Sequence, residues 1–124
     1  MSETAPSPEP LSTEDLARLA AELASDHLAS DVVLLDLRDV SDFADFFIIA
    51  TGETGRHLDA IADDLTRQLR NQGLHIHHRE GVGQGGWILL DFPGFVVHLF
   101  SRETREHYRL DELWSRATEL VRIQ

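Results

Sequence analysis

Three histidines lie close together in the middle of the chain, and their spacing could serve a metal ion. His75 and His77 would share one face of a strand, because side chains alternate along a strand, and His78 follows directly. A zinc site needs a third or fourth ligand, and His98 or Asp91 could supply one from a neighbouring strand. The sequence does not show that these side chains converge, so a solvent-facing sheet edge is the favoured interpretation.

Four glycines between residues 81 and 86 raise the question of a phosphate-binding loop. Such a loop needs its glycines between a strand and the N-terminus of a helix, with GxGxxG or GK[ST] spacing. Here the glycines lead into a strand, and the chain contains no lysine. The segment is therefore predicted to be a flexible connector into a hairpin.

Catalytic groups are not evident elsewhere in the sequence. Cysteine is absent, which excludes disulfides and thiolate nucleophiles, and no serine lies in a GxSxG turn. A two-metal nucleotidyltransferase would need closely spaced carboxylates on a strand after a Gly-Ser turn. Asp36 and Asp39 do not supply that pattern, and Gly52 is followed by glutamate. We expect no catalytic residue, no cofactor and no metal.

Aromatic and acidic side chains gather instead in the last third of the chain. On a pleated strand Trp87, Leu89 and Asp91 share one face, and the intervening isoleucine and leucine share the other. A core built on the second face would leave the tryptophan at the outer face beside the acid. With Tyr108 nearby, such a cluster has the composition of a protein-binding hot spot. Burial of the indole in the core is the alternative.

Charge and hydropathy restrict the possible partners. The 124 residues include 22 acidic and 11 basic side chains, all arginine, for a net charge of −11. An acidic surface repels phosphate backbones, which disfavours direct nucleic-acid readout and favours basic proteins as partners. The alternative is that the charge only maintains solubility. No apolar run approaches the ~20 residues that span a bilayer, and the N-terminus lacks signal-peptide features, so we expect a cytoplasmic protein without membrane contact.

Periodicity and turn signals predict one domain at residues 11–124, preceded by a disordered tail at residues 1–10 that is rich in proline, serine and glutamate. Only seven residues join the first two predicted strands, so these strands should be antiparallel. The later strand, helix and strand should form a right-handed βαβ unit. The expected elements are a helix capped by Ser12 and Asp15, strands at 32–38 and 46–51, a helix from Thr54 to Gly73, and a strand at 74–79.

A hairpin and a helix complete the predicted domain. Two apolar runs, 87–91 and 95–101, flank Phe92-Pro93-Gly94, and Pro followed by Gly is typical of a type II turn. A helix is expected after Tyr108, because apolar residues from 110 to 121 recur at helical spacing. The predicted fold class is α/β or α+β, with a mixed sheet of about five strands flanked by helices.

Across roughly residues 12–120 the chain resembles the ribosomal silencing factor family, also called the Iojap family. The order and spacing of several short motifs carry the resemblance. The matching pieces are Ala44-Asp45-Phe46-Phe47-Ile48-Ile49, Thr51-Gly52, Arg56, Ala60-Ile61-Ala62-Asp63, Glu80-Gly81, Trp87-x-Leu-x-Asp91, Val96-Val97-His98-x-Phe100, Arg105-x-x-Tyr108-x-Leu110 and Glu112-Leu113-Trp114.

The resemblance implies a fold similar to a nucleotidyltransferase core that lacks the active site. It further implies a translation repressor that binds the large ribosomal subunit through its ribosomal protein fourteen. Bound there, such a protein blocks joining of the small subunit and lowers translation under nutrient limitation or in stationary phase. A basic ribosomal protein would suit the acidic balance of this chain.

By resemblance, Trp87 is expected to be the apolar anchor of the interface, with Leu89 beside it. The expected polar rim consists of Asp91, Glu80 and Tyr108. Structural roles are assigned to His98, Arg105 and Trp114. Two alternatives remain open: a cryptic nucleotidyltransferase that binds nucleotide and magnesium, and a self-associating scaffold that forms a homodimer through the hairpin or the Trp114 helix.

Overall fold

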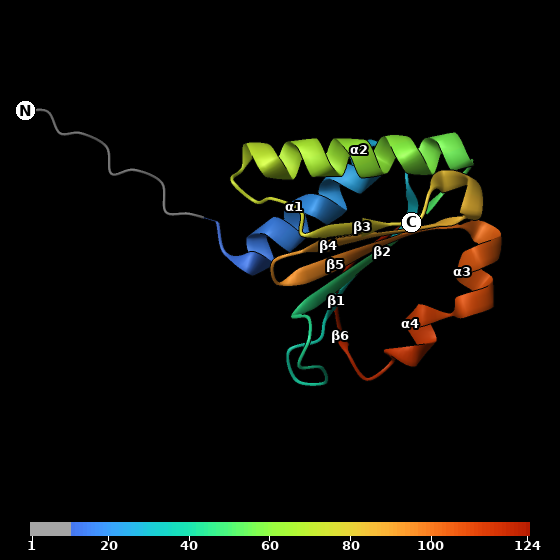
Figure 1. Ribbon diagram of the computed structural model, residues 1–124. Coiled ribbons are helices and arrows are strands. Elements are labelled where there is room, and N and C mark those ends of the chain that lie inside the picture. Colours follow the sequence, from blue (N-terminus) through green and yellow to red (C-terminus); the bar gives the residue numbers. More distant parts are fainter. Residues whose placement is uncertain (1–10) are drawn as a thin grey trace, which may run out of the picture.

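The computed structural model describes residues 11–124, and the predicted disordered tail at residues 1–10 lies outside the described part. Helices and strands are interspersed along the chain (Figure 1). The elements are α1 (Thr13–Asp26), β1 (Ser30–Asp36), β2 (Phe46–Gly52), α2 (Gly55–Asn71), β3 (His78–Glu80), β4 (Trp87–Phe92), β5 (Phe95–Ser101), α3 (Arg102–Tyr108), α4 (Leu110–Leu113) and β6 (Thr118–Ile123).

The strands form one six-stranded mixed sheet in the order β3-β4-β5-β2-β1-β6. Strands β2 and β5 pair in parallel, whereas all the other neighbours are antiparallel. The predicted fold class is therefore confirmed, as are the antiparallel pairing of the first two strands and the hairpin around Pro93-Gly94. Gly94 has a φ of +90°, which a side chain would strain.

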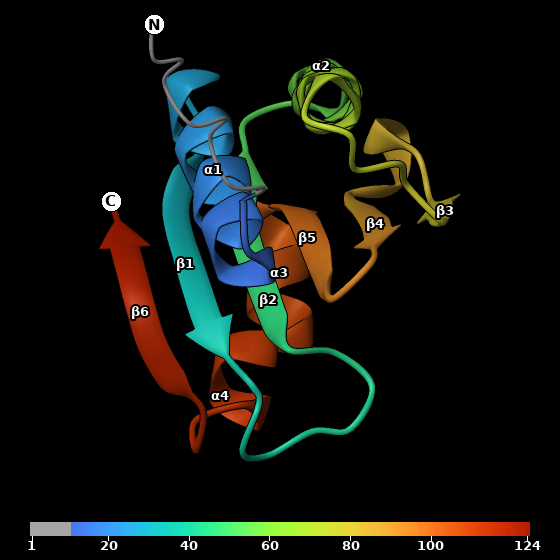
Figure 2. The ribbon, with the colours of Figure 1, turned by 90° about the vertical axis from the view of Figure 1, so that its left-hand side faces the viewer.

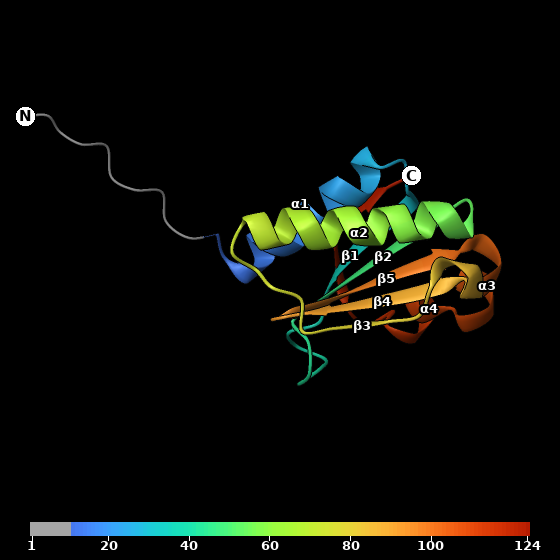
Figure 3. The same ribbon diagram turned by 45° about the horizontal axis from the view of Figure 1, so that its top comes forward.

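Helices cover the two faces of the sheet unequally. The long helices α1 and α2 lie side by side on one face, and the short helices α3 and α4 lie on the opposite face (Figures 1 and 3). Both long helices begin as predicted, α1 with a capping box between Ser12 and Asp15 and α2 with Thr54 as its N-cap. Four alanines of α1 are fully buried, and their small size lets the helix lie close to the sheet.

The prediction of a continuous helix from residue 110 to residue 121 is wrong. Helix α4 ends at Leu113, and Thr118–Ile123 is instead the edge strand β6, paired with β1 (Figure 2). The apolar residues in this segment suit a strand as well as a helix, and the free edge of the buried strand β1 decides the outcome. Arg109, with a φ of +50°, separates α3 from α4.

The strand predicted at residues 74–79 is also shorter and later than expected. Strand β3 covers only His78–Glu80, and residues 74–77 are not part of a strand. The residue before β3 also bonds to β4: the His77 N–H donates to the Asp91 carbonyl oxygen at 2.8 Å. β3 thus still forms one edge of the sheet.

Candidate protein-binding face

The candidate site is the face of the sheet opposite α1 and α2, which we call the outer face. Strand register brings side chains from β3, β4 and β5 together there. Glu80 lies opposite Leu89, which lies opposite His98. The next row pairs Trp87 with Phe100, and a row on the other side contains His78, Asp91 and Val96.

The alternation along β4 decides which side chains reach this face. Ile88 and Leu90 are fully buried in the core under the long helices, whereas Trp87, Leu89 and Asp91 are half-buried on the outer face. The prediction that these three residues share one face is confirmed, and the indole is not sealed in the interior. A shallow cavity of about 200 Å³ lies beside the indole, lined by Glu80, Gly81, Trp87 and Leu89.

The Trp87 indole is held by three neighbours. Its ring centroid lies 4.6 Å from that of Tyr108 and 5.0 Å from that of Phe100. The indole N–H donates to Nδ1 of His98 at 3.2 Å. Tyr108 is itself 45% exposed. An aromatic side chain fixed in this way loses little conformational entropy on binding, which favours affinity.

His98 is the buried polar member of the outer face. It is only 5% exposed, and burial lowers the pKa of His98 to about 4, so the imidazole is neutral at pH 7. Because Nδ1 accepts from the indole, Nε2 carries the proton. That Nε2 has no hydrogen-bond partner within residues 11–124. The neutral imidazole therefore acts as a fixed acceptor that orients Trp87.

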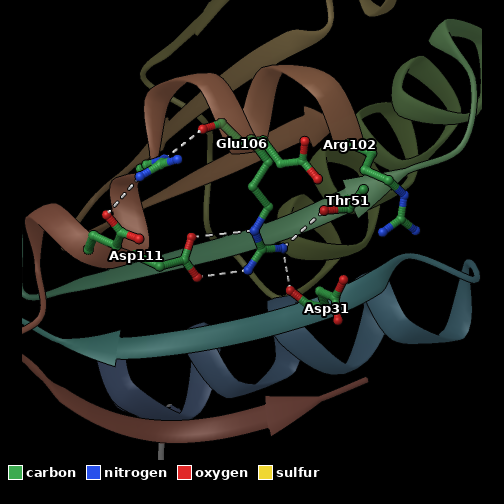
Figure 4. A pocket seen from close by; sticks show the side chains of 8 residues that line it. Asp31, Thr51, Arg102, Glu106 and Asp111 are labelled. Atoms are coloured by element: carbon green, nitrogen blue, oxygen red, sulfur yellow. Dashed lines mark hydrogen bonds and ion pairs between the residues drawn. The ribbon is translucent and has the colours of Figure 1, made fainter.

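Arg105 ties the short helices to the sheet. Its Nη1 donates to the Asp31 carbonyl oxygen and, at 3.0 Å, to Oγ1 of Thr51, while Nη2 donates to Asp111 at 2.8 Å. These contacts join α3 and α4 to β1 and β2, and they position the segment that carries Tyr108. The guanidinium lies in an open cavity of about 440 Å³, with Arg102 on the far side from Asp111 (Figure 4).

Trp114 closes the other end of the outer face. Its ring lies edge-on to Phe47, with the centroids 5.5 Å apart, and edge-on to Phe43 at 6.4 Å. Val40 and Leu110 pack into the same apolar cluster. Trp114 is half-buried, so it joins the following chain to β2 rather than projecting freely.

The histidines and glycines that suggested other chemistry have different environments. His78 pairs with Glu80 at 2.8 Å, and within residues 11–124 no group of three or more acidic or histidine side chains could hold a metal ion. The glycine segment forms a short 3₁₀ turn packed on α2, where the Gly83 N–H donates to Asp59 at 2.9 Å. A Cβ at Gly83 would lie 1.8 Å from the Gly55 carbonyl oxygen, so this connector is closely packed rather than flexible.

Phe43 was not among the residues singled out from the sequence. In the structure its side chain is 79% exposed. In the sequence, the signal for this residue was an aromatic side chain among aspartates in a seven-residue connection between strands.

No helix in the described part of the chain is both long and apolar enough to cross a bilayer.

A mixed sheet with an aromatic outer face is the architecture of a small α/β domain, and comparisons with known proteins identify its family. Residues 10–124 match the family model described as "Ribosomal silencing factor during starvation". The chain is 36% identical over 107 residues to the ribosomal silencing factor of Halalkalibacterium halodurans, covering 86% of this chain and 92% of that protein. It is 31% identical over 107 residues to that of Bacillus subtilis, covering 86% and 91%.

Solved structures agree with this assignment. A crystal structure of a protein from Chromobacterium violaceum superposes with a TM-score of 0.81 at 28% identity, covering 85% of this chain and 88% of that one. The chain belongs to the ribosomal silencing factor family. Membership gives it a ribosome-associated role in regulating translation, and this family is not a known family of enzymes.

Proposed function

We propose that the chain binds the large ribosomal subunit through its ribosomal protein fourteen and blocks joining of the small subunit. It would thereby lower translation in the cytoplasm when nutrients are scarce. The proposal needs no catalysis, cofactor or membrane, and it uses contacts with protein rather than readout of RNA sequence.

The observation that carries this proposal is the half-buried Trp87 on the outer face. Its ring packs on Tyr108 and its N–H is bound to His98, so the indole is held in place with part of its surface free. Central tryptophans and tyrosines on well-ordered surfaces are the side chains on which protein interfaces most depend. Leu89 adds apolar area beside the indole.

Charge supports a basic protein as the partner. The chain carries a net charge of −11, and on the outer face Glu80 lies opposite Leu89 on the neighbouring strand while Asp91 lies two residues along β4. Ribosomal proteins are commonly basic because they contact RNA phosphates. Opposite charge would speed the encounter and fix the orientation of the complex, while the aromatic anchor would supply most of the affinity.

Blocking by occupation requires only that the bound domain fill the space that the small subunit would enter. One rigid domain bound to the joining surface would then prevent subunit association in proportion to its occupancy. No reaction step needs to be assigned to the outer face.

The first test is co-sedimentation of purified protein with isolated large subunits. We expect Trp87→Ala to weaken binding by about tenfold or more, the usual effect of removing a central aromatic anchor. Leu28→Ala is the matched control, because Leu28 is an 80% exposed apolar residue beyond the end of α1. Circular dichroism should show that both variants keep their secondary structure. Wild-type binding by Trp87→Ala would contradict the anchor role.

The second test measures subunit joining on sucrose gradients. Wild-type protein should lower the fraction of joined ribosomes as its concentration rises, and Trp87→Ala should require a correspondingly higher concentration. Binding of the wild type to the large subunit without any effect on joining would contradict the blocking mechanism.

A further inference from the structure

Phe43 is an exposed aromatic residue on the connection between β1 and β2. It is 79% exposed, and the connection extends beyond the ends of β1 and β2 (Figure 2). Main-chain bonds close the base of the connection: the Leu37 N–H donates to the Asp45 carbonyl oxygen at 2.8 Å, and the Asp45 N–H donates to that of Gly94 at 2.9 Å. Leu37 and Ala44 are buried beneath it. The ring is therefore presented from a fixed base.

A continuous row of rings joins Phe43 to the Trp87 site. Successive ring centroids along the row are 4.6 to 6.4 Å apart, within the range of direct aromatic contact. The interior members are half-buried or buried, whereas Phe43 and Tyr108 at the two ends are exposed. The row runs through Phe43, Trp114, Phe47, His98, Trp87 and Tyr108.

The surroundings of Phe43 are acidic. Asp39, Asp42 and Asp45 are exposed on the same connection. Arg38 and Arg116 line the same cavity as Phe43, but the Arg38 guanidinium is already paired with Asp36 at 2.6 Å and with Glu14 at 3.3 Å, so carboxylates outnumber guanidinium groups around the ring. An exposed aromatic ring among carboxylates matches a basic protein surface that contains an apolar depression. A site for nucleic acid would have the opposite charge.

We propose that Phe43 is a second anchor of the docking surface, which inserts into an apolar depression bordered by basic side chains on the protein partner. This inference rests on the proposed function, because it assigns Phe43 to the same partner as Trp87. Two anchors separated along one aromatic row, Phe43 at one end and Trp87 next to the other, fix the orientation of the bound domain, whereas a single anchor leaves it free to pivot. A fixed orientation keeps the bound domain in the space that the small subunit would enter.

The test is co-sedimentation with large subunits, using Phe43→Ala, Phe43→Tyr, Trp87→Ala and Leu28→Ala. We expect Phe43→Ala to weaken binding by about fivefold or more and Phe43→Tyr to retain most of it, because a ring still fills the depression. Leu28→Ala removes a side chain of nearly equal exposure and should bind as the wild type does. The melting temperature of Phe43→Ala should stay within a few degrees of the wild type, since the ring is largely exposed in the free protein.

Further outcomes separate the two proposals. Loss of binding in Trp87→Ala with unchanged binding in Phe43→Ala would overturn the second anchor and leave the proposed function standing. Failure of the wild type to sediment with large subunits would overturn both. If light scattering showed a wild-type dimer that Phe43→Ala converts to a monomer without loss of ribosome binding, Phe43 would belong to a self-interface and the second anchor would be refuted.

Association kinetics test the acidic surroundings. Asp39→Asn combined with Asp42→Asn should slow association with the large subunit at low ionic strength, and the difference from the wild type should shrink as salt is added. Equal association rates at low salt would contradict a basic surface opposite Phe43.

Discussion

The two faces of the sheet differ in both composition and cover. The face under α1 and α2 is aliphatic apart from a few phenylalanines, and its main residues, such as Ile48 and Leu90, are completely buried. The outer face mixes aliphatic residues with aromatic ones, among them Phe47, Trp87 and Phe100, and α3 and α4 cover it only in part. Aliphatic packing on the first face stabilises the fold but presents no side chains to a partner. The second face keeps rigid rings near water, where they are available to a partner.

Ile48→Ala should give the largest effect and test the stabilising role of the first face. The side chain is fully buried on β2, so its truncation should lower the free energy of unfolding by about 2–5 kcal/mol. Urea denaturation measures the change. Binding of large subunits by the remaining folded fraction should be unaffected, because the residue points away from the outer face. If fully folded Ile48→Ala lost binding, the assignment of stability to one face and binding to the other would be contradicted.

Arg105→Met should give the next largest effect, because Arg105 holds the short helices of the outer face in place. The substitution removes bonds to Asp31, Thr51 and Asp111 and leaves Asp111 without its ion pair. We expect a loss of about 2 kcal/mol in urea denaturation. Arg105→Lys should recover little of it, since an ammonium group cannot reproduce the forked geometry. Unchanged stability in both variants would show that the short helices dock without this contact.

His98 should give the outer face a pH dependence in mildly acidic solution. The pKa of His98 is lowered to about 4 in the folded protein, so between pH 6.5 and 4 the unfolded chain takes up a proton that the folded chain does not. Stability should therefore fall as the pH drops through this window, by about 1.4 kcal/mol per unit at most from this residue. The pKa of Asp36 is also lowered, chiefly by its hydrogen bond with Arg38, but that contribution is lost only at lower pH.

Denaturation of wild type and His98→Gln at several pH values isolates the histidine contribution. The variant should show a shallower decline of stability between pH 6.5 and 4.5, whatever its stability at pH 7. If stability declined with pH equally in the two proteins, His98 would take up its proton in the folded state as readily as in the unfolded chain, which would contradict the lowered pKa.

Local features of this chain were predictable from sequence, and long-range ones were not. The capping box at Ser12 and the alternation of Trp87, Leu89 and Asp91 depend only on near neighbours, and both were predicted. The edge strand β6 was mistaken for a helix, because its identity depends on the free edge of β1 about ninety residues earlier. The main-chain partner of Arg105 is likewise 74 residues away.

The same contrast between local and long-range features applies to the candidate site. The tryptophan, its neighbours on β4 and the tyrosine followed from pleat and composition, together with a family resemblance. Phe43 was missed, because only the folded chain places that connection beside Trp114. Contacts between rings on different elements are fixed by tertiary packing, for which a single sequence gives no direct signal.

The irregular pairing of β6 with β1 also affects how the molecule meets copies of itself. The register of the two strands shifts between Leu34 and Leu35, so the outermost strand carries a bulge near its centre. A bulged edge offers a poor template for main-chain pairing with a second sheet. Growth of intermolecular β-structure along this edge is thereby discouraged, even though the edge strand is rich in β-branched and aliphatic residues.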